Sequence, residues 1–170
     1  PELYLNGGAA VVVCGEGEIT LGDVLDKLSG RVVQPLATIP GLCLRSPDGQ
    51  LLKTPSRPIV RALDSLPDPA WDLVDVEKYR RVWMERHGYF SMNVVTTRGC
   101  PYHCNWCAKP IYGQRYTSRT PQHVAAEIAL LVKRYRPDQL WIADDILGLK
   151  PGWIEQFASI VAEQQSAVPF

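Results

Sequence analysis

Strands and amphipathic helices alternate in the second half of the chain, and this order most constrains its fold. An apolar strand pattern over 91–97 is followed by a polar loop and a helical pattern over 120–135. The order repeats with a strand over 140–143 and a helix from Trp153 onward. Strands that alternate with amphipathic helices indicate a parallel sheet joined by crossover helices. The sequence therefore predicts an α/β fold for residues 91–170.

The first half of the chain shows a different layout. A valine-rich strand over 10–14, a glycine-containing turn and a helical pattern over 20–28 come first. An Asp-Gly pair then predicts a hairpin with its turn at 47–50. Prolines break any regular period between 55 and 69, which indicates an extended connector with a short helix over 76–81. The predicted segments are 1–54, 55–90 and 91–170.

Charge, hydropathy and length narrow the class of protein. The 18 Lys and Arg balance the 18 Asp and Glu, so we expect neither nucleic acid nor an anionic membrane as a partner. No stretch reaches the ~20 apolar residues of a membrane helix, and no signal-peptide layout is present, so we expect a cytoplasmic protein. The 170 residues begin at Pro1 and fall short of the roughly 250 of a complete barrel, which suggests a fragment.

The five cysteines are distributed unevenly. Cys100, Cys104 and Cys107 lie within eight positions, which suits metal binding in a reducing compartment better than a disulfide framework. Cys14 and Cys43 stand in separate apolar runs, where we expect small buried hydrophobic residues.

The C-x3-C-x2-C spacing favours an iron-sulfur cluster with one open iron. Thiolates are soft ligands that suit such clusters, zinc and copper. A 4Fe-4S cluster held entirely by protein takes four cysteines, so three leave one iron free for a substrate or cofactor, like the vacant position of a catalytic zinc. Two alternatives stay open: a structural zinc site with His103 as fourth ligand, and an electron-transfer cluster completed by Cys43.

The segment Cys100-Pro-Tyr-His-Cys104-Asn-Trp-Cys107 resembles the signature of the radical S-adenosylmethionine (SAM) superfamily. The resemblance implies a TIM-type barrel, here partial, with a 4Fe-4S cluster as the metal centre. It also implies that SAM binds the open iron, and that one electron from a flavodoxin or ferredoxin cleaves it to methionine and a 5′-deoxyadenosyl radical. No catalytic group is expected beyond the cluster and SAM.

The resemblance further implies SAM contacts outside the cysteines. Trp106 would lie near the adenine, although by default such a residue is a core aromatic beneath the loop. Asp144 and Asp145 follow a strand, at the edge where barrel active sites lie, and one of them would bind the SAM ammonium group. Alternatively, the acidic pair caps the next helix.

Two further segments resemble a narrower group, the cobalamin-binding radical SAM proteins. Tyr112 to Tyr116 and Arg119 to Pro121 match the segment after the cluster loop, so Arg115 or Arg119 could bind a carboxylate of SAM. A surface arginine is the alternative for each. Glu127, in the helix that follows, receives no role.

The turn Gly15-Glu16-Gly17 resembles the end of the cobalamin-binding domain that precedes the barrel in this group. Ligands of open α/β sheets lie beyond the carboxyl ends of the strands, so the resemblance places cobalamin near these residues. Such a turn also uses glycine for backbone reasons alone. The order of turn, hairpin, proline connector and cluster loop matches the group over nearly the whole chain. None of the 3 histidines stands in the D-x-H-x-x-G pattern by which some members ligate cobalt.

The expected fold class is α/β: the C-terminal edge of a Rossmann-like cobalamin-binding domain, a β-hairpin and Pro-rich linker, and a partial (βα) radical SAM TIM-type barrel. The resemblance implies an enzyme that methylates, cyclises or rearranges a small-molecule, lipid or tetrapyrrole substrate. Its cofactors would be a 4Fe-4S cluster, SAM and cobalamin. An iron-sulfur electron-transfer protein and a zinc-stabilised binding module are the alternatives. The isolated fragment is expected to be inactive, because strands that would line the pocket are missing.

Overall fold

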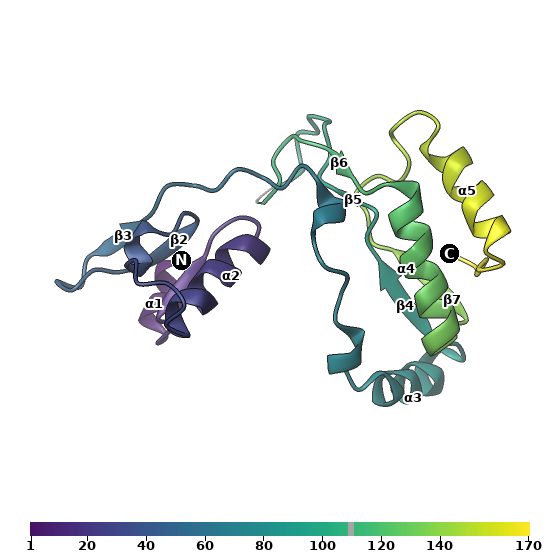
Figure 1. Cartoon of the computed structure of the whole chain (residues 1–170), viewed down its shortest axis with the longest axis horizontal. Coiled ribbons are helices and arrows are strands. Elements are labelled where there is room, and N and C mark those ends of the chain that lie inside the picture. The colour runs from purple at the N-terminus through teal and green to yellow at the C-terminus, as the bar shows by residue number, and fades with distance from the viewer. Residues whose placement is uncertain (109–110) are drawn as a thin grey trace. The chain divides into compact units, whose positions relative to one another are not determined.

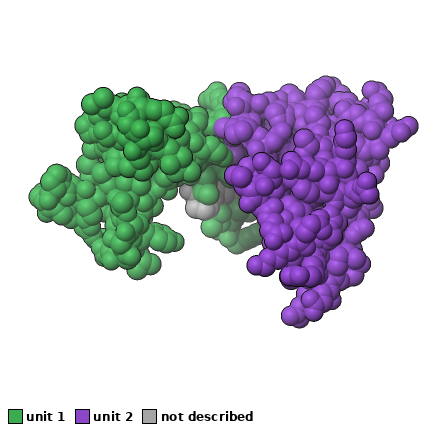
Figure 2. Space-filling model, turned by 60° about the horizontal axis from the view of Figure 1, so that its bottom comes forward, with its two compact units in different colours: residues 1–61, 104–113 green, residues 62–103, 114–170 purple. Residues whose placement is uncertain are grey.

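The computed structural model describes residues 1–108 and 111–170, which form two compact units (Figure 2). The first unit comprises Pro1–Arg61 and Cys104–Gly113, and the second comprises Ala62–His103 and Gln114–Phe170. The division after Arg61 falls inside the predicted connector. The three segments predicted from the sequence stay predictions.

A small antiparallel sheet organises the first unit (Figure 1). Its strands, in spatial order, are β1 Val11–Val13, β2 Leu42–Arg45 and β3 Leu51–Lys53. Its helical elements are α1 Glu2–Asn6, α2 Glu18–Leu28 and the 3-10 turn η1 Leu36–Thr38. The predicted order of strand, turn and helix is therefore found in β1 and α2, whereas α1 was not predicted.

The hairpin prediction is confirmed. Leu44 lies opposite Leu52 in the antiparallel β2–β3 pair. The Ser46 amide donates a hydrogen bond to the Gln50 carbonyl across the turn, with nitrogen and oxygen 2.9 Å apart. Gly49 has a φ of +82°, a conformation that the Asp-Gly pair supplies at little cost.

The first unit has a small apolar core, and of the two cysteines expected to be buried, Cys14 and Cys43, one is buried. The buried core residues are Val24, Ile39 and Leu42. Cys43 on β2 is 0% exposed, which confirms that it is a buried hydrophobic residue. Cys14 is exposed, so the same prediction for Cys14 is wrong. The reason is that β1 ends at Val13, and Cys14 already belongs to the turn.

Gly41 is the glycine of the first unit that leaves least room for a side chain. Its φ is +84°, and an added Cβ would lie 2.9 Å from Thr20 Oγ1 and 3.3 Å from the Cys14 carbonyl oxygen. We expect Gly41→Ala to destabilise the protein by about 2 kcal/mol in urea unfolding. Gly22→Ala on α2 is the control: no atom lies within 4 Å of its Cβ, so about 1 kcal/mol of stabilisation is expected. Equal effects of the two changes would contradict this packing.

The second unit combines two pairs of strands with helices. Its strands are β4 Ser91–Val94, β5 Thr97–Arg98, β6 Thr117–Ser118 and β7 Gln139–Ile142. Its helical elements are α3 Val76–His87, α4 Pro121–Tyr135, α5 Trp153–Glu163 and the 3-10 turns η2 Leu63–Ser65 and η3 Trp71–Leu73. No helix in the described parts of either unit is long and apolar enough to cross a membrane.

The predicted parallel sheet is confirmed for β4 and β7, which α4 connects. Met92 lies opposite Leu140 in the parallel pair. Thr120 caps α4, because its Oγ1 accepts the His123 amide hydrogen at a nitrogen to oxygen distance of 3.2 Å. The helix ends at Tyr135, and its C-cap Arg136 adopts a left-handed conformation just before a proline.

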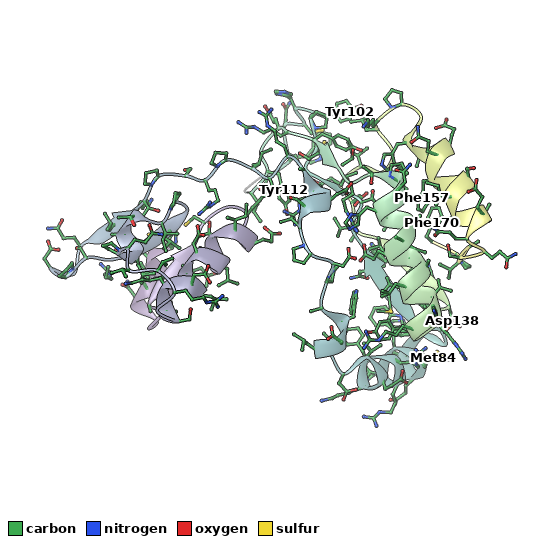
Figure 3. All side chains as sticks on the ribbon, viewed as in Figure 1. Met84, Tyr102, Tyr112, Asp138, Phe157 and Phe170 are labelled. Carbon is green, nitrogen blue, oxygen red and sulfur yellow. The ribbon has the colours of Figure 1, made fainter. Side chains whose placement is uncertain are left out.

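One face of the β4–β7 pair is buried under helices. Met92, Val94 and Leu140 are at most 3% exposed and pack in the same core as α4 and α5. Phe157, labelled in Figure 3, belongs to this core from α5. Trp141 on β7 is 62% exposed, because alternate strand side chains point to opposite faces.

Helix α3 is longer than the predicted range 76–81, since it continues to His87. Asp75 accepts a backbone N–H of the first turn at 3.0 Å, and Gly88 ends the helix with a φ of +77°. Only Val76 is buried on this helix, and the charged residues between Val76, Tyr79 and Trp83 weaken its hydrophobic signal in the sequence. The capping residues Asp75 and Gly88 therefore indicate the bounds of α3 better than its apolar residues do.

Candidate cofactor site

The cysteine loop begins and ends at a short antiparallel strand pair of the second unit. Arg98 on β5 lies opposite Thr117 on β6. Within the loop, Cys104 and Cys107 are exposed and Cys100 is partly buried. The Cys107 amide donates to the Cys104 carbonyl at 3.2 Å, which forms a tight turn between these two residues.

The donor chemistry of this loop fits a soft metal centre. None of the described cysteines forms a disulfide, so all three loop thiols keep their ligand chemistry. Over 1–108 and 111–170, no three Cys, His, Asp or Glu side chains are gathered in the geometry of a metal site. The cluster on Cys100, Cys104 and Cys107 is therefore a prediction from sequence.

The two ring-bearing residues next to the cysteines are both exposed. Trp106 is 88% exposed, so the alternative of a core aromatic beneath the loop is wrong. Its contact with SAM stays a prediction. His103 is exposed, as expected for a loop residue that faces solvent.

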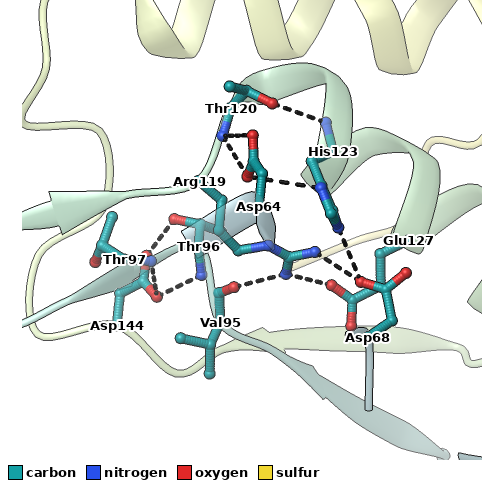
Figure 4. A network of polar contacts seen from close by, with 10 residues as sticks. All are labelled: Asp64, Asp68, Val95, Thr96, Thr97, Arg119, Thr120, His123, Glu127 and Asp144. Atoms are coloured by element: carbon teal, nitrogen blue, oxygen red, sulfur yellow. Dashed lines mark hydrogen bonds and ion pairs between the residues drawn. The ribbon is translucent and has the colours of Figure 1, made fainter. Parts of the chain in front are cut away.

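Asp144 is bound to the backbone at the end of the neighbouring strand (Figure 4). Its Oδ1 accepts the amide hydrogens of Thr96 and Thr97, at nitrogen to oxygen distances of 2.8 and 3.0 Å. Its Oδ2 accepts the hydroxyl hydrogen of Thr96. Both carboxylate oxygens of Asp144 therefore already have partners within the protein.

Asp145 differs from its neighbour. The residue is exposed, and its carboxylate makes no hydrogen bond or ion pair with the described part of the chain. The alternative that the acidic pair caps the next helix is wrong, because α5 begins at Trp153 with Gly152 as its N-cap. Of the two aspartates, Asp145 has the carboxylate that is available to a ligand.

Arg119 lies at the centre of a partly buried ionic cluster (Figure 4). Its side chain is 12% exposed, so the alternative of a surface arginine is wrong. The guanidinium pairs with Glu127 and, at 3.1 Å, with Asp68, and it donates to the Val95 carbonyl at 2.9 Å. The predicted contact between Arg119 and a SAM carboxylate would require exchange of these partners.

Glu127 is a buried member of this cluster to which the sequence pattern assigned no role. Its side chain is 3% exposed, and burial raises its pKa above the ordinary value of 4.5, while the hydrogen bond and charge of Arg119 oppose that rise. A signal was present in the sequence: position 127 falls on the apolar stripe that includes Val124 and Leu131. A carboxylate on such a stripe needs a cationic partner nearby.

Two aspartates of the proline connector attach it to the start of α4. Asp64 accepts the Thr120 amide hydrogen at 3.0 Å. His123 lies between the two carboxylates, with its Nε2 3.1 Å from Asp68 and its Nδ1 3.6 Å from Asp64. Neither aspartate stands out in the sequence, because their partners are more than 50 residues away along the chain.

The glycine turn of the first unit lies beside a cavity of about 300 Å³. The residues that line it are Cys14, Gly15, Gly41, Leu42, Lys53, Thr54, Ser56, Arg57 and Ile111. Gly15 has a φ of +85°, and no atom lies within 4 Å of the point that a Cβ would occupy. Glu16 accepts the Val60 amide hydrogen, and Gly17 is the N-cap of α2. Only Gly15 of the three predicted residues lines the cavity.

The structure thus has an α/β fold with a three-cysteine loop that follows a parallel strand, and the chain has relatives among known proteins. No protein-family model matches the chain. An uncharacterized methyltransferase of Pyrococcus horikoshii is 32% identical over 153 residues, which are 88% of this chain and 31% of the relative.

Two further curated relatives carry more specific names. The anaerobic magnesium-protoporphyrin IX monomethyl ester cyclase of Rubrivivax gelatinosus is 29% identical, over 79% of this chain and 24% of its own. The cytidylyl-2-hydroxyethylphosphonate methyltransferase of Streptomyces wedmorensis is 28% identical, over 79% of this chain and 29% of its own. The chain therefore spans less than a third of the length of these relatives.

Solved structures show the same fold. The cobalamin-dependent SAM radical enzyme OxsB, with aqua-cobalamin and SAM bound, matches 99% of this chain and 23% of its own with a TM-score of 0.76 and 18% identity. The radical SAM methyltransferase TsrM of Kitasatospora setae matches 95% of this chain and 30% of its own, with a TM-score of 0.65 and 22% identity. The chain belongs to the cobalamin-binding radical SAM family and corresponds to a part of such proteins.

Proposed function

We propose that this chain is the cluster-binding part of a cobalamin-dependent radical SAM enzyme in the cytoplasm. The observation that carries the proposal is the C-x3-C-x2-C loop, which follows the first strand of the parallel β4–α4–β7 unit. Active sites of such α/β barrels lie at the carboxyl ends of the strands. The names of two relatives support methylation of a small-molecule substrate or cyclisation of a tetrapyrrole substrate. A rearrangement and a lipid substrate stay part of the proposal.

The proposal assigns the cluster to three cysteines and the contacts with SAM to two further side chains. Cys100, Cys104 and Cys107 would hold a 4Fe-4S cluster and leave one iron for SAM. With one electron from a flavodoxin or ferredoxin, a cluster held there would supply the reductive cleavage of SAM to methionine and a 5′-deoxyadenosyl radical. The exposed indole of Trp106 would cover the adenine, and the available carboxylate of Asp145 would accept hydrogen bonds from the SAM ammonium group.

The open space beside Gly15 supports a cobalamin contact in the first unit. Because no side chain covers this backbone, a large planar ligand can approach it closely. When bound, cobalamin would supply the cobalt that carries a methyl group. Glu16 would shape the turn, since its carboxylate already binds the connector backbone at Val60.

Anaerobic reconstitution of the full-length protein with iron and sulfide tests the proposal. We expect about four irons per chain, a visible charge-transfer absorption, and a reduced-cluster paramagnetic resonance signal that changes when SAM is added. A reduced-cluster signal that does not change when SAM is added would instead identify an electron-transfer protein. One equivalent of zinc without iron would identify a zinc-stabilised binding module, and either outcome contradicts the proposal.

A further inference from the structure

The segment that follows β7 binds both ends of the cysteine loop. At the entry, Asp144 accepts the amide hydrogens of Thr96 and Thr97. The Thr97 hydroxyl in turn donates to the Ile146 carbonyl at 3.1 Å. At the exit, the Tyr116 hydroxyl accepts the Leu149 amide hydrogen at 3.2 Å.

The entry contact lies just before the first cysteine. Thr97 is three positions before Cys100, and Thr96 and Thr97 are 1% and 4% exposed. The Thr96 carbonyl also accepts the Arg119 amide hydrogen at 2.9 Å, so both sides of this peptide segment are held. A fixed backbone at Thr96 and Thr97 limits the positions that the Cys100 side chain can reach.

We propose that the two adjacent aspartates have separate tasks: Asp144 is a positioning residue for the cysteine loop, and Asp145 is the one that contacts SAM. This inference rests on the proposed function. It follows from the geometry, because both oxygens of Asp144 are occupied by Thr96 and Thr97 whereas Asp145 is exposed. An anionic acceptor that binds two amides also makes the strong kind of hydrogen bond.

Hydrogen exchange of the metal-free, full-length protein tests the positioning contact directly. In Asp144→Ala we expect the Thr96 and Thr97 amides to exchange roughly tenfold faster, because they lose their acceptor. Asp145→Ala is the matched control and should leave both rates unchanged. Asp144→Asn should restore slow exchange, since its amide oxygen can accept the same two hydrogens. Unchanged rates in Asp144→Ala would overturn the inference.

Cluster reconstitution of the same variants tests the division of tasks. Asp144→Ala should retain several-fold less iron than the wild type, and Asp144→Asn should retain as much as the wild type. Asp145→Ala should bind iron normally, but its reduced-cluster signal should no longer change when SAM is added. The reverse pattern would overturn the inference. If the wild-type protein takes up no iron, the proposed function fails, and the exchange rates alone then decide whether Asp144 holds the loop.

Discussion

Replacing Cys104 by alanine is expected to abolish retention of the cluster. Two thiolates cannot hold a 4Fe-4S cluster that needs at least three protein ligands and leaves one iron for SAM. We expect the iron content of reconstituted full-length Cys104→Ala to fall at least tenfold below that of the wild type. Iron and sulfide determination after gel filtration measures this directly.

Cys14→Ala is the matched control for this prediction. Cys14 is exposed like Cys104, and it lies in the turn after β1 rather than in the cysteine loop. Its replacement should leave iron content within error of the wild type, and circular dichroism should show both variants folded. Equal loss of iron from Cys14→Ala and Cys104→Ala would show that the ligands have been wrongly assigned.

Replacing Arg119 by methionine is expected to destabilise the second unit strongly. The change leaves the Glu127 carboxylate, 3% exposed, without its cationic partner. Removal of one partner of a buried ion pair costs about 3–5 kcal/mol, so urea unfolding at pH 7 should show a loss in this range. Arg115→Met is the control, because Arg115 is exposed, and its effect should stay within about 0.5 kcal/mol.

The loss of stability in Arg119→Met should depend on pH. Burial holds the pKa of Glu127 above 4.5 in the folded wild type, so protonation of this group favours the folded state and its contribution is lost as pH rises. Without Arg119 the pKa rises further, and the difference from wild type should therefore be larger at pH 7 than near pH 4.5. The double variant Arg119→Met/Glu127→Met should recover part of the loss. A loss independent of pH and of Glu127 would contradict the buried pair.

Local patterns in the sequence predicted the elements of the fold well where apolar period and caps agree. Helix α4 is the clearest case, because Thr120 caps it and its apolar stripe is buried as expected. The predicted range for helix α3 is too short because charged residues dominate the helix, which weakens the hydrophobic signal on which such predictions depend. The prediction that Cys14 is buried is wrong because a sequence pattern does not fix the last residue of a strand.

The site could be predicted only as far as its motif reaches. The three cysteines stand close in sequence, so their spacing alone indicates their chemistry. The partners of Asp144 and Arg119 are distant in the chain, and hydrogen bonds such as those to Thr96 and Asp68 depend on the folded arrangement. Sequence therefore left Asp144 and Asp145 indistinguishable, whereas the hydrogen bonds of the structure separate them.

The short β5–β6 pair has a consequence for how readily the cysteine loop can take up metal. By pairing Arg98 with Thr117, the protein closes the loop before any ligand arrives. The entropy of bringing the loop ends together, which grows with the logarithm of loop length, is then a cost of folding and not of metal capture. Cluster assembly then has only to order the residues inside the closed loop. Closure of the loop also raises the effective concentration of each thiol relative to the others.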